Sequence, residues 1–249
     1  MTISLDDYIS AGNVLTQFID GAAPNSWMRN LQHATEDLLP GKFLSVGFCG
    51  APIAPVFTWM GPTDEDYVQF GIPPDRISEL TKWADERFDQ EIGYPNLFMR
   101  LETAREYIRR FTNGMTEMQL IGMGLHKDYL RKIAEIERLN PRRIDKSGAT
   151  VAGFEGGGFA QAVKLAKPVI PGEILGFDVI ALRDAIDHSW HCNGLALTGL
   201  REFGFRPNSI GLLDDRANAE KIARYAEEKF IEDRIWLPLL LIRYPLQSV

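Results

Sequence analysis

The chain has 249 residues, 45% of them apolar and 24% charged, with a formal net charge of −7. These proportions are those of a globular protein and exclude disordered and collagen-like chains. The length suffices for one large hydrophobic core or two modest ones. The negative charge argues against general binding to nucleic acid, which needs a dense basic surface.

Cysteine occurs only as Cys49 and Cys192, and two residues cannot cross-link a protein of this size. We therefore expect reduced thiols and a cytoplasmic location. Residues 1–7 lack the basic start and apolar run of a secretory signal. The longest apolar run near the other end, 235–242, is too short to span a bilayer. We expect no membrane partner.

Hydrophobic spacing predicts the elements of region 1–142 in chain order. Apolar residues at helical intervals predict a first helix over 5–19 and a second over 27–39, which Pro40-Gly41 ends. Short runs bounded by Gly and Pro then predict strands over 43–49 and 55–60. The remaining expectations are a helix over 73–88, a strand over 97–101, a helix over 104–111, an extended segment over 118–123 and a helix over 128–139.

The stretch 140–158 combines Pro141 with several glycines and charged residues, which predicts a linker over 143–158 before a second region over 159–249. In that region the pattern predicts helices over 159–166, 195–203 and 215–230 and strands over 174–182, 209–213 and 236–244. Asp214 is the expected cap of the long helix, and Phe230 is expected on its buried face.

The order of strands and helices favours an α+β fold, with a mixed or mainly antiparallel sheet, several packed helices and one or two subdomains. The glycines of 153–158 do not form a phosphate-binding loop, because Phe159-Ala160 stand where Lys and Ser or Thr are needed. We interpret them as a turn or linker and expect no cofactor.

His188 and His191 are three residues apart, and on a helix both imidazoles could reach one metal ion. The metalloprotease pattern has a Glu after the first His and a four-residue spacing, and neither is present. The favoured interpretation is a packed junction between a strand and a helix, without metal.

Cys192 offers an enzymatic alternative, as a nucleophile that His188 or His191 activates. Asp178, Asp184 or Asn193 would orient the histidine. The local signatures of cysteine-protease families are missing, and a buried, inert thiol is the favoured interpretation. A hydrolase or transferase with this site remains the second hypothesis.

Four segments of the C-terminal third carry a family resemblance: 176–178 (Gly-Phe-Asp), 188–195, 206–208 (Arg-Pro-Asn) and 211–215. They resemble a module of uncharacterised bacterial proteins, some of which are similar to the immunity partners of secreted antibacterial toxins. The resemblance implies a toxin-blocking role as a class and transfers no functional residues.

The first hypothesis is therefore a cytosolic immunity-type protein that occludes the active site of a protein partner. Acidic groups would steer a basic toxin towards its binding surface. The candidate binding residues fall in two acidic stretches, one early and one late in the chain: Asp64, Glu65 and Asp66, and Glu227, Glu228 and Asp233. A non-catalytic subunit of a larger assembly is a further alternative.

Overall fold

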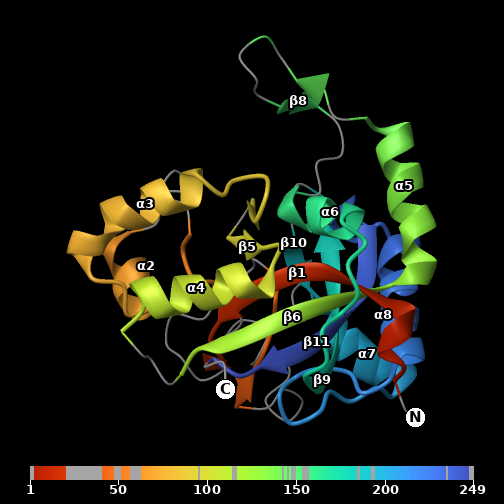
Figure 1. Cartoon of the computed structure of the whole chain (residues 1–249). Helices are drawn as coiled ribbons and strands as arrows, with labels where there is room; N and C mark the ends of the chain where they lie inside the picture. The colour runs from red at the N-terminus through yellow and green to blue at the C-terminus, as the bar shows by residue number, and fades with distance from the viewer. Residues whose placement is uncertain are drawn as a thin grey trace.

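The computed structural model describes residues 3–20, 41–47, 52–56, 63–94, 96–113, 117–141, 143–144, 146, 150–152, 157–183, 186–191, 194–233 and 235–246. Their main feature is a seven-stranded sheet in the order β10-β9-β11-β6-β1-β5-β4, shown in Figure 1. Every pair of neighbouring strands in this sheet is antiparallel. The α+β prediction, with a mainly antiparallel sheet, is confirmed.

The strands of this sheet are β1 (Tyr8–Thr16), β4 (Ile92–Gly93), β5 (Leu97–Phe98), β6 (Gln119–His126), β9 (Glu173–Leu182), β10 (Ile186–Ser189) and β11 (Ile235–Tyr244). Two small two-stranded sheets pair β2 (Ile19–Asp20) with β3 (Lys42–Phe43) and β7 (Arg143–Ile144) with β8 (Thr150–Ala152). The helices are α2 (Asp64–Gln69), α3 (Ile77–Asp85), α4 (Leu101–Phe111), α5 (Leu130–Leu139), α6 (Gly157–Lys164), α7 (Leu195–Phe203) and α8 (Arg216–Glu228). Short 3-10 helices are η1 (Leu5–Asp7), η3 (Pro74–Arg76), η4 (Lys127–Tyr129) and η5 (Ile231–Asp233).

Strand β11 joins the two halves of the chain, because it pairs with β9 on one side and with β6 on the other. Leu240 lies opposite Gly124, and Tyr244 lies opposite Leu120. The sheet therefore contains strands from both predicted regions, 1–142 and 159–249. The predicted linker over 143–158 contains the β7–β8 hairpin and the start of α6. The division of the chain into two subdomains remains a prediction.

Helices cover both faces of the sheet. Successive side chains of β11 point to opposite faces and contact different helices. Trp236, Leu240 and Ile242 belong to a core cluster with residues of α4, α7 and α8. Leu237 and Leu241 belong to a second cluster, with residues of α5 and α6, on the opposite face. Because both faces are covered, the central strands are apolar on both sides.

The helix predicted over 5–19 is wrong, because most of this segment is the central strand β1. Its apolar residues are buried on both faces, and such a run cannot be told from a helix by spacing alone. Gly12 excludes a helix, since its φ of 99° is left-handed. The register of β1 against β6 shifts between Ser10 and Asn13, so Gly12 lies in a bulge.

Most other predicted elements are confirmed with changed ends, as α3, α4, α5, α6, α7, α8, β5, β6, β9 and β11. The strand predicted over 209–213 is wrong: this segment forms only an isolated bridge, between Leu213 and Phe177. The cap of α8 is Asp215 rather than Asp214, because its side chain accepts from the amides of Ala217 and Asn218.

The early part of the chain is only partly described. The helix predicted over 27–39 lies outside the described residues. Among the described residues of the strand predicted over 43–49, Phe43 is in a strand and 44–47 is irregular, while 48–49 lies outside the described residues. Of the strand predicted over 55–60, the described residues 55–56 are also irregular. Among the helices that the structure describes, none has the length and apolar character needed to cross a membrane.

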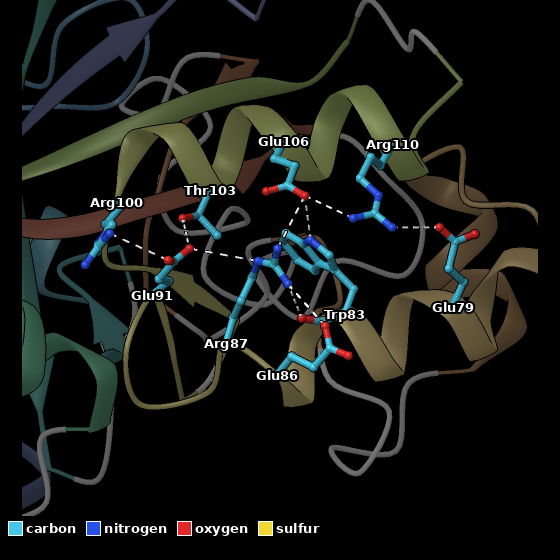
Figure 2. A network of polar contacts seen from close by, with 9 residues as sticks. All are labelled: Glu79, Trp83, Glu86, Arg87, Glu91, Arg100, Thr103, Glu106 and Arg110. Carbon is cyan, nitrogen blue, oxygen red and sulfur yellow. Dashed lines mark hydrogen bonds and ion pairs between the residues drawn. The ribbon is translucent and has the colours of Figure 1, made fainter.

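A network of charged side chains joins α3 to α4 (Figure 2). Glu106 is at its centre and accepts from Trp83 Nε1 at 2.8 Å and from Arg110 at 3.0 Å. Arg110 also pairs with Glu79 at 2.9 Å, and the Arg87 guanidinium lies 4.7 Å from the Trp83 ring centre. Glu79, Glu106 and Arg110 therefore help to hold α3 and α4 together.

Candidate functional site

The predicted histidine pair lies at a strand-to-helix junction, but the two rings have different surroundings. His188 is in β10, and its Nε2 lies 2.7 Å from Oε2 of Glu232. His191 is buried in the turn after β10, with its ring centre 4.9 Å from Phe43 and 5.1 Å from Trp190. Burial lowers the pKa of His191 to about 3, so this ring is neutral at physiological pH.

The nucleophile hypothesis remains untested, because Cys192 and Asn193 lie outside the described residues, as does Asp184. In the ranges that the structure does describe, no three His, Cys, Asp or Glu side chains are grouped as metal ligands would be. The contacts of His188 and His191 are those of a packed junction.

Asp178 is a fully buried carboxylate in β9, and it holds the irregular segment 44–47 against the sheet. Its Oδ2 accepts from Ser45 Oγ at 3.2 Å and from the amide of Val46 at 3.1 Å. Burial raises the pKa of Asp178 to about 6, although these hydrogen bonds oppose the shift. The sequence suggests a chemical role for Asp178 only as one of three groups that would orient the histidine beside Cys192. An acid in an otherwise apolar strand was the signal of its burial.

The first predicted binding stretch lies at the start of α2, where Asp64, Glu65 and Asp66 are exposed. Asp66 has a structural role, because it forms a capping box with Thr63. The amide of Thr63 donates to Asp66 Oδ2 at 2.6 Å, and the amide of Asp66 donates to Thr63 Oγ1 at 3.3 Å. Asp64 and Glu65 are left as acidic surface groups beside a helix N-terminus, where negative charge is favourable.

The second predicted stretch lies at the C-terminal end of α8. Glu227 is partly buried and pairs with Lys132, and it accepts from the amide of Trp236 at 3.1 Å. Glu228 is exposed. The side chain of Asp233 is outside the described residues. Glu227 therefore helps to hold α8 against α5 and β11, while Glu228 is available at the surface.

Phe230 is the residue at this end of α8 that sequence reasoning placed wrongly. Helix α8 ends at Glu228, so Phe230 lies beyond the buried face that its spacing predicted, and it is 81% exposed. Its φ of 51° is left-handed, which is unusual for a bulky residue. We call the exposed charged and aromatic group Glu228, Lys229, Phe230 and Glu232 the Phe230 surface.

The turn that carries Phe230 is fixed on both sides. The carbonyl of Ile231 accepts from Trp236 Nε1 at 3.1 Å, and Glu232 pairs with His188. The amide of Phe230 donates to the carbonyl of Glu227 at 3.0 Å. Its ring is therefore held out in solvent by an anchored turn.

Comparison of the chain with protein-family models, with curated proteins and with solved structures finds no match to any of them.

Proposed function

We propose that this protein is a binding protein of the immunity type, which neutralises a protein toxin by covering its active site with the Phe230 surface. The observation that carries the proposal is an aromatic side chain that is 81% exposed in an anchored, left-handed turn. Such a backbone costs about 1–3 kcal/mol, and it persists only where the surrounding structure holds it.

The chemistry of this surface fits a protein partner. Large aromatic side chains supply much of the binding energy at protein interfaces, and a charged rim around them excludes water. Glu228 and Lys229 supply this rim next to Phe230, and Glu232 borders it. The net charge of −7 would speed association with a basic partner.

The test is co-expression with the product of the neighbouring reading frame, with complex formation and protection of cells as readouts. We expect a stoichiometric complex with the unaltered chain. Phe230→Ala should weaken it about 30-fold or more, as removal of an interface anchor does. Binding is measured by titration calorimetry, and protection by survival of cells that express the toxin.

Leu139→Ala is the matched control, because Leu139 is also exposed (66%) but lies at the end of α5. It should change the affinity by less than about twofold. The proposal fails if the neighbouring product does not bind, or if both variants bind it as tightly as the unaltered chain does.

A further inference from the structure

A cavity of about 150 Å³ lies where the N-terminal segment, the end of β6, β9 and the start of α8 meet. Figure 1 shows the N-terminal segment beside α8. The cavity is next to Arg216, the first residue of α8, whereas Phe230 lies beyond the other end of this helix. The inference below therefore does not depend on the proposed function.

One wall of the cavity is aromatic. The Tyr8 ring centre is 5.0 Å from that of His126, at an interplanar angle of 89°, and 6.5 Å from that of Phe177. Tyr8 is only 5% exposed, yet its hydroxyl makes no hydrogen bond to the residues that the structure describes. The charges that act on this hydroxyl include Arg216 and Asp7, which line the same cavity. This hydroxyl is therefore available to a polar atom of a ligand in the cavity.

Three carboxylates border the cavity: Asp7, Asp214 and Asp215. Asp214 uses Oδ1 to accept from Asn208 at 2.8 Å, and Asp215 uses Oδ1 to accept from the amide of Ala217 at 2.7 Å. The second oxygen of each of these two carboxylates remains for a ligand. Asp7 is exposed and also lines the cavity.

The positive groups of the cavity do not cancel this charge. Arg216 is already paired with Asp128 at 2.9 Å and with Glu220 at 2.6 Å. His126 accepts the amide of Asp128 on Nδ1 at 3.2 Å, and burial together with the charge of Arg216 lowers the pKa of His126. The imidazole is therefore neutral at physiological pH, and the cavity is negative.

Two donors remain for an acceptor atom. Nε of Arg216 is buried and has no hydrogen-bond partner. An unsatisfied buried donor is costly, and a ligand oxygen would relieve this cost. The hydroxyl of Tyr8 is the second donor in the same cavity.

We propose that this cavity binds an organic cation, an ammonium or guanidinium group on a short aliphatic chain that also carries an acceptor such as an amide oxygen. The aromatic wall attracts the cation, and the carboxylates pair with it. Tyr8 and Arg216 donate to the oxygen. A lysine or arginine residue of a protein has this chemistry, and so has a free amino-acid amide.

The test is an NMR titration of the whole chain at low salt with Nα-acetyl-lysine methylamide, Nα-acetyl-arginine methylamide and the uncharged Nα-acetyl-norleucine methylamide. One cationic probe or both should shift the resonances of Tyr8 and His126, and the norleucine probe should bind at least about tenfold more weakly. Asp7→Asn and Tyr8→Phe should each weaken binding of the cationic probe about two- to fivefold. Asp6→Asn, at an exposed neighbour outside the cavity, should leave it unchanged.

Lysinamide and a pentapeptide with a central lysine separate the two sources of the cation. Tighter binding of lysinamide assigns a free amine, and equal or tighter binding of the peptide assigns a protein side chain. The proposal is overturned if the norleucine probe binds as well as the cations, if Asp7→Asn does not change the affinity, or if the shifts lie elsewhere in the chain. Thermal unfolding of each variant verifies that it is folded.

Discussion

Asp178 shows how one buried carboxylate couples folding to pH. It is fully buried in β9, and burial raises its pKa in the folded protein from the ordinary 3.8 to about 6. Ionisation of Asp178 therefore opposes folding. Its favourable contribution is complete below pH 3.8 and is lost as the pH rises through about 6.

Asp178→Asn should remove this pH dependence while keeping an acceptor oxygen for Ser45 and Val46. We expect the stability of the variant relative to the unaltered chain to rise by on the order of 2–3 kcal/mol between pH 4 and pH 7. Urea titrations at the two pH values measure this difference, and a constant cost of the substitution cancels. Asp64→Asn, at an exposed carboxylate, is the control. An equal difference at both pH values would contradict the assignment.

The contact between α3 and α4 combines polar and apolar groups. Trp83 is buried, and its indole nitrogen is bonded to Glu106 on the facing helix (Figure 2). The Trp83 ring also lies 5.3 Å from Phe111 of α4. The polar network and this aromatic contact both join α3 to α4. Loss of the polar network should therefore loosen the two helices without removing the apolar contact between them.

Glu106→Ala should lower the free energy of unfolding by about 1–2 kcal/mol, because Trp83 Nε1 and Arg110 lose their acceptor. Glu102→Ala is the matched control on the same helix, since Glu102 is exposed. It should cost about 0.5 kcal/mol or less. Chemical denaturation measures both. Equal effects of the two substitutions would show that the network does not stabilise the fold.

At the scale of the whole molecule, the shared sheet makes the two halves of the chain depend on each other. Half of β11, Leu240–Tyr244, is paired with β6 of the first half, and its other edge is paired with β9. A fragment without β6 would expose this edge and the apolar residues beside it, which is a known cause of aggregation.

The whole chain should therefore unfold in one transition, with the same midpoint by far-UV circular dichroism and by tryptophan fluorescence. The isolated region 159–249 should show no cooperative unfolding. Two separate transitions, or a cooperative transition of the fragment, would instead establish the division at 143–158 as a domain boundary.

The sequence by itself determined the α+β class and most elements of the C-terminal half, including α7, α8, β9 and β11. The apolar residues of these segments recur at one clear spacing or form a long run. Residues such as Gly204, the C-cap of α7, mark where the elements end. The local sequence pattern is sufficient to predict an element that has one solvent-facing side or capping residues that mark its ends.

Only the tertiary structure decided the rest. Residues 8–16 are a strand because β6 and β5 flank them and helices cover both faces, so their helical spacing has no bearing on the outcome. Phe230 is exposed because α8 ends two residues before it. The cavity joins Tyr8, His126 and Arg216, which are far apart in the chain. A single sequence carries no signal for such a meeting, since contacts between distant residues arise only when the strands are ordered in the sheet.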